Sequence, residues 1–290
     1  MDIIVCVKEV PNPALPVEFD FENNTVKSDE WNYILNQYDE VALEQALVIK
    51  EQYGGTVTVI TVGEKRSEEV LRKCLALGAD EAVRVDITGF FLPDSLATAR
   101  VLSRVVNKIT GDIILCGDQS TDRNCGDTGG MLAELLGLPV VTSVVEMDID
   151  INENTVTVSK KLERGARAVK RCRLPALFNT DLMLNEPRYP TLSGRKKAAG
   201  HEIRIINLND IFKDEESRDF ENQCVRTIAM APPSPKKIFI PTGDLSPAER
   251  IRMLTQGIRA QKNDSTILEG SPEQIAQKTV ALLIEKRFLS

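Results

Sequence analysis

The chain has 290 residues, of which 42% are hydrophobic and 27% are charged. This balance is typical of a globular protein with a substantial core, and it excludes wholesale disorder. The formal net charge of −7 argues against a general nucleic-acid binder.

The N-terminal half alternates short β-branched runs with helical patterns. Residues 3–7, 56–62, 82–85 and 113–116 are predicted strands, while 42–49, 70–75, 94–109 and 128–136 have helical spacing. Strands that alternate with helices indicate a parallel sheet covered by helices. No apolar run reaches the roughly 18 residues that span a bilayer, and the start lacks the pattern of a signal peptide. We therefore expect a cytoplasmic protein without a transmembrane segment.

The segment from Ile114 to Gly137 combines a buried strand, a glycine-rich polar loop and a helix. In a parallel sheet, such a loop directs backbone N–H groups and a helix N-terminus toward an anion. The segment matches neither GxGxxG nor the P-loop, so ATP hydrolysis is not expected. We predict a phosphate-binding loop, with a simple tight turn as the alternative.

From Val140 onward, antiparallel strands are predicted at 140–148, 156–160 and 166–174, as an extension or a cap of the sheet. The segment from Lys160 to Arg173 holds seven basic residues and one acidic residue. Its alternation could present one cationic face to a flavin phosphate or an acidic partner. A solvated hairpin is an equally good interpretation.

The segment LNEPRYPTLSGRKKA, from Leu184 to Ala198, contains two prolines, a glycine and a basic end. We expect neither a helix nor an inner strand there. Beyond His201 the chain is irregular, with helix starts predicted at Ser246 and Ser271. Residues 201–290 have too little continuous apolar surface for a core of their own. We expect an arm that packs on a partner, or alternatively on its own domain.

The six cysteines are far apart and form no CxxC motif, which favours free thiols in a reducing compartment. His201 is the single histidine, so the sequence offers little for a metal centre or a catalytic triad. No metal site is predicted.

The segment LPALFNTDLMLNEPRYPTLSGRKKA, Leu174 to Ala198, closely resembles the signature of the electron transfer flavoprotein β subunit. The segments VKEV, NQYDEVALEQAL, LALGADEAVRV and CGDQSTDRNCGDTGG follow that family's order and spacing. The resemblance implies a Rossmann-like α/β fold of the adenine nucleotide α-hydrolase type over residues 1–205, with antiparallel additions. Residues 206–290 would then be an extended C-terminal arm that packs on the α subunit.

By this resemblance, the chain pairs with an α subunit that holds most of the FAD, and it supplies an adenine-nucleotide site and one wall of the flavin cleft. The cofactor carries the redox chemistry, so no catalytic acid–base residue is expected and the chain is an electron carrier subunit. The family's nucleotide contacts fall on two sets of positions: Cys6, Asn36, Gln37, Tyr38, Asp39 and Val59, and Gly117, Asp118, Gln119, Ser120, Thr121, Asp122, Arg123, Asn124, Cys125, Gly126, Asp127 and Thr128.

Residues 184–200 resemble the family's recognition loop, which docks a partner dehydrogenase of the acyl-CoA or hydroxy-acid type. By this resemblance, Leu192 corresponds to the apolar anchor of that loop. A rigid loop with one exposed apolar anchor suits a transient interface, because it loses little conformational entropy on docking. Turn structure with a buried Leu192 is the alternative. The partner-binding residues predicted in this loop are Glu186, Arg188, Tyr189, Leu192 and Lys197.

Three functions remain open from the sequence. Cys125 and Thr128 resemble the pattern of family members that bind AMP, whereas VKEVPNP at Val7–Pro13 resembles relatives that bind a second FAD. The leading hypothesis is a simple electron carrier, and the first alternative is an electron-bifurcating complex that uses NAD(H). A nucleotide-binding regulatory module of the universal-stress type, without a redox role, is the alternative from another class.

Overall fold

The computed structural model describes residues 1–15, 19–20, 25–26, 32–90, 92, 94–109, 111–212, 225, 268 and 270–285. By internal contacts the chain divides into two units, Met1–Pro232 and Pro233–Ser290. In the described part of the chain, no helix is long and apolar enough to cross a membrane.

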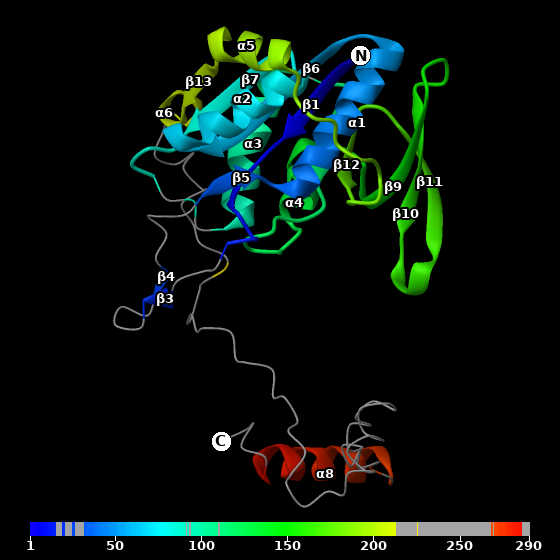
Figure 1. Ribbon diagram of the computed structural model, residues 1–290. Coiled ribbons are helices and arrows are strands. Elements are labelled where there is room, and N and C mark those ends of the chain that lie inside the picture. Colours follow the sequence, from blue (N-terminus) through cyan, green and yellow to red (C-terminus); the bar gives the residue numbers. More distant parts are fainter. Residues whose placement is uncertain are drawn as a thin grey trace, which may run out of the picture. The chain divides into compact units, whose positions relative to one another are not determined.

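The first unit contains a nine-stranded sheet with helices on both faces (Figure 1). The strands of the sheet are β1 (Asp2–Cys6), β6 (Thr56–Gly63), β7 (Glu81–Asp86), β8 (Ile113–Gly117), β9 (Val140–Asp150), β10 (Thr155–Lys161), β11 (Arg167–Arg173), β12 (Ala176–Thr180) and β13 (Arg204–Asn207). The helices are α1 (Gln37–Tyr53), α2 (Glu68–Leu77), α3 (Ser95–Ile109), α4 (Thr128–Leu136), α5 (Leu192–Gly200) and α6 (Leu208–Ile211), with short 3₁₀ turns η1 (Lys65–Ser67) and η2 (Glu163–Gly165). Two small ladders pair β2 (Glu9–Pro11) with β5 (Tyr33–Leu35) and β3 (Phe19–Asp20) with β4 (Thr25–Val26).

The strand order is β11-β10-β9-β12-β8-β1-β6-β7-β13. In this spatial order, each neighbouring pair in the stretch β9-β12-β8-β1-β6-β7-β13 is parallel. The chain first builds outward from β1 through β6 to β7, and then returns to place β8 on the other side of β1. This is the order of a Rossmann-type sheet, whose direction of winding reverses between β1 and β8. Loops that leave the two strands there diverge, which opens a crevice at their carboxyl ends.

Side chains of the central strands alternate between the two faces of the sheet, so the core has two apolar layers, one on each face. Ile3 and Val5 of β1 pack in the layer under α1, α2 and α5, whereas Ile4 and Cys6 pack in the layer under α3 and α4. Successive side chains of a strand point to opposite faces, so both layers draw on the same strands. The expectation of a parallel sheet buried on both faces is confirmed.

The antiparallel strands extend the sheet. β9 runs parallel to β12, and β10 and β11 continue antiparallel from it as a hairpin that projects beyond the helical layers (Figure 1). The basic residues predicted on a hairpin are thus on β10, η2 and β11. Lys160 donates to the hydroxyl of Thr142 at 2.6 Å, and Lys161 forms an ion pair with Asp181 at 2.9 Å.

One central strand was not predicted. β12 lies between β8 and β9, and all five of its residues are buried. Its sequence, ALFNT, is a short apolar run that follows Pro175, a pattern typical of a fully buried strand. Phe178 is completely buried on it.

The expectation of no helix within Leu184–Ala198 is wrong from Leu192 onward, where α5 begins. Both prolines precede the helix, so neither breaks it. The hydroxyl of Thr191 caps it by accepting a hydrogen bond from the backbone N–H of Gly194 at 3.0 Å. The segment is therefore an irregular loop followed by a capped helix.

In the second unit, the described structure is α8 (Pro272–Glu285). It begins with the predicted capping box: Gln274 accepts from the backbone N–H of Ser271 at 3.1 Å, and Ser271 accepts from that of Gln274 at 3.4 Å. The helix start predicted at Ser246 lies outside the described residues. β13 continues the sheet past residue 205, and the arm function of residues 206–290 stays a prediction.

Candidate functional site

A cleft with a volume of about 290 Å³ opens at the carboxyl ends of β1, β6 and β8, between the β8–α4 loop and α3. This is the position at which open α/β sheets bind ligands. Its floor is formed by side chains of the layer under α3 and α4. The lining residues are Cys6, Val7, Lys8, Asn36, Asp39, Ile60, Val62, Ile87, Leu92, Asp94, Ser95, Thr98, Leu102, Cys116, Gly117, Asp118, Gln119, Ser120, Asp122, Arg123, Cys125, Gly126, Thr128 and Gly129.

The carboxylate of Asp39 ties together the three elements that meet at the crevice. It accepts hydrogen bonds from the backbone N–H of Lys8 after β1 (2.8 Å), from the backbone N–H of Gly117 at the end of β8 (3.2 Å) and from the side-chain amide of Asn36 (3.0 Å). Asp39 itself belongs to the first turn of α1. One side chain therefore sets the separation of β1 and β8 at the point where the sheet changes direction.

Burial raises the pKa of Asp39 from 3.8 to about 7. The side chain is 5% exposed, and removing a carboxylate from water disfavours its charged form. The three donors and the Lys8 ammonium act in the opposite direction without cancelling the effect. Asp39 is consequently a structural group whose charge changes near neutral pH.

Asn36 holds the β8–α4 loop against α1. Its side-chain amide N–H donates to the backbone carbonyl of Gln119 at 2.9 Å, and its oxygen accepts from the backbone N–H of Thr121 at 3.3 Å. The hydroxyl of Tyr38 accepts from the side-chain amide of Gln119 at 2.6 Å. Residues 36–39 therefore act by shaping the loop that lines the cleft.

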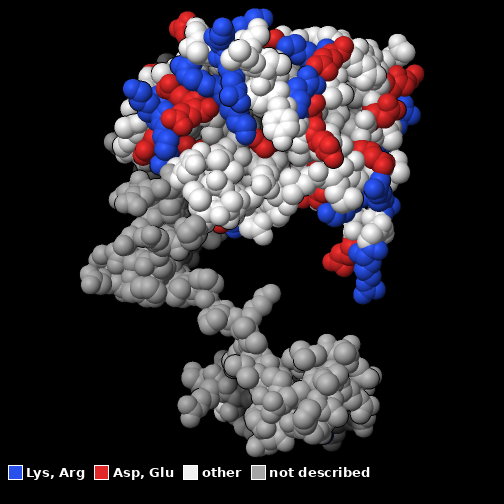
Figure 2. Space-filling model, viewed as in Figure 1, with Lys and Arg blue, Asp and Glu red and all other residues white. Residues whose placement is uncertain are grey.

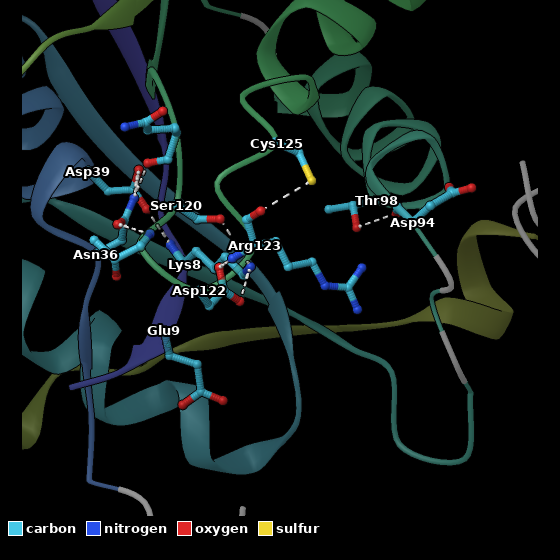
Figure 3. Close-up of polar contacts among 12 residues, drawn as sticks. Lys8, Glu9, Asn36, Asp39, Asp94, Thr98, Ser120, Asp122, Arg123 and Cys125 are labelled. Carbon is cyan, nitrogen blue, oxygen red and sulfur yellow. Dashed lines mark hydrogen bonds and ion pairs between the residues drawn. The ribbon is translucent and has the colours of Figure 1, made fainter. Parts of the chain in front are cut away.

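Lys8 connects β1 to the same loop (Figure 3). Its ammonium forms an ion pair with Asp122 at 2.5 Å and lies 3.4 Å from the hydroxyl of Ser120. Burial acts to raise the pKa of Asp122, but the hydrogen bonds from Lys8 and Ser120 outweigh it, and the pKa is lowered. Arg123 extends from the loop into the space between it and α3, where Asp94 and Thr98 lie (Figure 3).

Two glycines permit the close packing of these elements. A Cβ on Gly117 would lie 2.3 Å from Oδ1 of Asp39 and 2.7 Å from Cβ of Tyr38. A Cβ on Gly129, in the first turn of α4, would lie 2.1 Å from Oδ1 of the buried Asn179. A side chain at either position would force α1 or α4 away from the sheet.

The cleft has the features of a site for a nucleotide phosphate. The first N–H groups of a helix have no partner within it, and Asp127 makes no side-chain cap at the start of α4. Gly126 has a φ of +72°, a left-handed conformation that suits glycine and turns the loop toward α4. A phosphate at this end would meet the helix N-terminus.

The structure brings most of the predicted nucleotide contacts to this cleft. Among the predicted residues, those that line it are Cys6, Asn36, Asp39, Gly117, Asp118, Gln119, Ser120, Asp122, Arg123, Cys125, Gly126 and Thr128. Val59 is fully buried in the layer under α1 and α2, on the opposite face from Ile60, which does line the cleft. Gln37, Tyr38, Thr121, Asn124 and Asp127 also lie outside the lining.

Sequence reasoning missed the wall contributed by α3. Asp94 caps that helix by accepting a hydrogen bond from the backbone N–H of Ala97 at 3.0 Å, and Ser95, Thr98 and Leu102 follow along the cleft. The helix start was visible in the sequence. Its position against α4 and β6 was not, because it depends on the order in which the strands join the sheet.

The predicted docking loop, residues 184–200, presents two large side chains to solvent. Tyr189 is 93% exposed and Leu192 is 73% exposed, so the alternative of a buried Leu192 is wrong. Glu186 and Lys197 are also exposed. Arg188 is half-buried and pairs with Glu44 and Glu51 of α1. Figure 2 shows Lys and Arg side chains gathered over the region where Figure 1 places α2 and α5.

Strand order and cleft position place the chain in the class of doubly wound α/β proteins with a Rossmann-like sheet. A family model described as the electron transfer flavoprotein domain matches residues 24–211. The chain belongs to the family of electron transfer flavoprotein β subunits. A β subunit of this family pairs with an α subunit, and flavin is associated with the heterodimer.

Curated relatives cover most of this chain. It is 33% identical over 241 residues to the electron transfer flavoprotein subunit beta of Bacillus subtilis, which covers 83% of this chain and 91% of the relative. It is 35% identical over 210 residues to Protein FixA of Azotobacter vinelandii (71% and 74%). It is 37% identical over 219 residues to the caffeyl-CoA reductase-Etf complex subunit CarD of Acetobacterium woodii (75% and 82%).

Proposed function

We propose that this chain is the β subunit of a heterodimeric carrier that relays electrons, through an FAD shared with the α subunit, between a dehydrogenase and a second redox partner. The dehydrogenase would be of the acyl-CoA or hydroxy-acid type. The observation that carries the proposal is the cleft at the β1–β8 reversal, bordered by the uncapped start of α4, in a chain of this family. The cysteines that the structure describes are free, which supports a cytoplasmic location.

The β-subunit cleft would hold AMP. Its volume of about 290 Å³ lies just below the roughly 300–1,000 Å³ usual for small-molecule sites, which favours a mononucleotide over a dinucleotide. The start of α4 and Arg123 would face the phosphate, and the apolar floor formed by Ile60, Val62 and Leu102 would receive the base. AMP would then act as a structural ligand that orders the loop.

The residues of this chain bind and position, and they transfer no proton in the reaction. FAD, when bound, supplies the electron-transfer chemistry. Asp39 and Asn36 keep the cleft and its loop in shape through the hydrogen bonds described above. Lys8 fixes the loop at Asp122. This division of roles explains why the site needs no histidine and no nucleophile.

Docking of the dehydrogenase would use the loop and helix at residues 184–200. Leu192 and Tyr189 supply exposed apolar surface, and Arg195, Lys196 and Lys197 of α5 supply exposed positive charge beside it. An apolar anchor with a charged rim is the composition of a specific, transient interface. The complementary surface would be an apolar pocket with an acidic border.

A bifurcating complex with a second FAD and NAD(H) use is the second candidate. The opening segment Val7–Pro13 favours it, and Protein FixA and the caffeyl-CoA reductase-Etf subunit are among the relatives. Val7 and Lys8 line the cleft, so this segment would contact the ligand that distinguishes the two functions.

Quantifying the ligands tests these functions. The chain is co-expressed with its α subunit, the purified heterodimer is denatured, and released FAD and AMP are measured by chromatography. One FAD and one AMP per heterodimer are expected. Two FAD without AMP would replace the carrier by the bifurcating complex. A heterodimer without flavin would overturn both and leave the regulatory module.

A further inference from the structure

We propose that Arg188, Glu44 and Glu51 form a clamp that presets the docking loop, so that Tyr189 and Leu192 face the partner before it arrives. Below, the word clamp refers to the side chains of these three residues. This inference rests on the proposed docking function of residues 184–200. It assigns Arg188 to positioning the loop and not to contact with the dehydrogenase.

The guanidinium of Arg188 is used almost completely inside the chain. Its Nε lies 3.1 and 2.9 Å from the two carboxylate oxygens of Glu44, and its Nη2 lies 2.9 Å from Oε1 of the same group. Its Nη1 pairs with Oε1 of Glu51, and Nη2 lies 3.2 Å from Oε2 of Glu51. Two carboxylates on one face of α1 thus hold one planar cation, a geometry that a lysine cannot reproduce.

The backbone of the loop is held by the same helix. The N–H of Arg188 donates to Oε2 of Glu44 at 3.1 Å, so one carboxylate binds both the side chain and the main chain of one residue. Three residues earlier, the side-chain amide of Asn185 donates to the backbone carbonyl of Val41 at 3.1 Å. Glu44 is only 8% exposed, and a carboxylate this deeply buried needs its partner.

The other end of the exposed segment is fastened to α2. Gly194 packs so closely that a Cβ there would lie 2.3 Å from the backbone carbonyl oxygen of Ala76. Arg72 of α2 donates to the carbonyl of Ala198 at 2.9 Å, near the end of α5. The residues between the two attachments, Tyr189 to Leu192, include the two most exposed large side chains of the loop.

A loop fixed at both ends loses less conformational freedom when it binds. The clamp therefore acts on affinity for the partner and on the order of the free loop. The clamp joins Arg188 to α1, whereas Tyr189 and Leu192 are exposed to solvent, so the loss of the clamp should leave the electron-transfer step of the docked complex unchanged. A contact residue and a positioning residue differ in this respect: the effect of the clamp must disappear once the anchor is gone.

The test uses the heterodimer with Arg188→Lys and Glu51→Gln, and with Arg66→Lys as the matched control. Arg66 also binds a carboxylate through two nitrogens, at Glu9 (3.0–3.2 Å), away from the loop. Steady-state reduction by an acyl-CoA dehydrogenase that reduces the wild type is measured together with hydrogen exchange of the loop amides. We expect the KM for the Arg188→Lys heterodimer to rise about tenfold, with kcat, FAD and AMP contents unchanged and exchange at residues 189–193 faster.

A Leu192→Ala background separates the clamp from the docking function. Arg188→Lys should raise KM no further in that background, because the anchor that the clamp presents is absent. Equal effects of Arg188→Lys with and without Leu192 would overturn the positioning role. Unchanged loop exchange in Arg188→Lys would overturn the clamp itself.

The outcome for Leu192→Ala alone judges the docking function independently. If its KM equals that of the wild type, docking at this loop is wrong, and the exchange rates still decide whether the clamp orders the loop. If Arg188→Lys does not assemble, the exchange measurement on Glu51→Gln decides instead. In Glu51→Gln, hydrogen-exchange rates equal to those of the wild type would refute the clamp. Faster exchange confined to residues 189–193 would support it.

Discussion

Replacing Gly117 by alanine tests the junction of α1 and β8 most directly. The added Cβ would lie 2.3 Å from Oδ1 of Asp39 and 3.0 Å from the backbone carbonyl carbon of Tyr38. The second of these atoms belongs to the main chain of α1, so rotation of a side chain cannot relieve the contact. The first turn of α1 must move away from β8, and the hydrogen bonds that Asp39 accepts must lengthen or break.

The cost combines overpacking with the loss of bonds to a buried carboxylate. Forced overpacking typically costs about 1–3 kcal/mol. A hydrogen bond to a charged group contributes about 1.5–3 kcal/mol. If only the bond from Gly117 is lost, we expect the free energy of unfolding to fall by roughly 2.5–6 kcal/mol.

Gly130→Ala is the matched control, because the same substitution there meets no atom within 4 Å. It lies in the first turns of α4, where alanine is favoured over glycine by about 0.5–1 kcal/mol. The two variants should therefore shift in opposite directions in urea unfolding followed by circular dichroism, and Gly117→Ala should lose nucleotide. Unfolding midpoints of the two variants that coincide would refute the packing described for Gly117.

Three further outcomes are expected. Asp39 has a pKa of about 7 in the fold against 3.8 ordinarily, so it contributes stability that is fully present below pH 3.8 and is lost as the pH rises through 7. The difference between the two pKa values corresponds to about 4 kcal/mol. Asp39→Asn should therefore flatten the plot of unfolding free energy against pH between about pH 4 and 8. An unchanged slope would contradict the raised pKa of Asp39. Gly126→Val should strip the nucleotide, because φ is +72° there and a Cβ would lie 3.1 Å from the carbonyl oxygen of Asp118; AMP content equal to wild type would remove this loop from the site. Leu192→Ala should raise the KM for the partner dehydrogenase by roughly tenfold or more and leave FAD content intact, whereas loss of FAD would show that the side chain is structural.

Local patterns predicted much of the sheet and several helix limits. The strands at 56–62, 82–85 and 113–116 are present with shifts of at most one residue at either end. α4 ends at Leu136, and Gly137 directly after it adopts the left-handed conformation expected of a C-terminal glycine. These features depend on side-chain periodicity and on backbone preferences of single residues, and both are written in the local sequence.

The resemblance identified the family of the chain and many of the residues that line the cleft. Glycines and polar residues of the β8–α4 loop were identified from their order in the sequence, and the structure brings most of them to one cleft. The environment of Val59 was not evident from that order. Val59 is adjacent to Ile60 in sequence, but strand alternation places it on the opposite face of the sheet, outside the lining of the cleft.

Contacts between distant segments could not be read from the chain. Asp39 resembled an ordinary helix-start residue, and its function as the tie between β1 and β8 depends on neighbours at positions 8 and 117. The ion pairs of Arg188 with Glu44 and Glu51 of α1 likewise join residues that are far apart in the sequence. These contacts join residues that are 31, 78 and 144 positions apart. They form only when the tertiary structure brings the segments together, and local sequence preferences do not encode them.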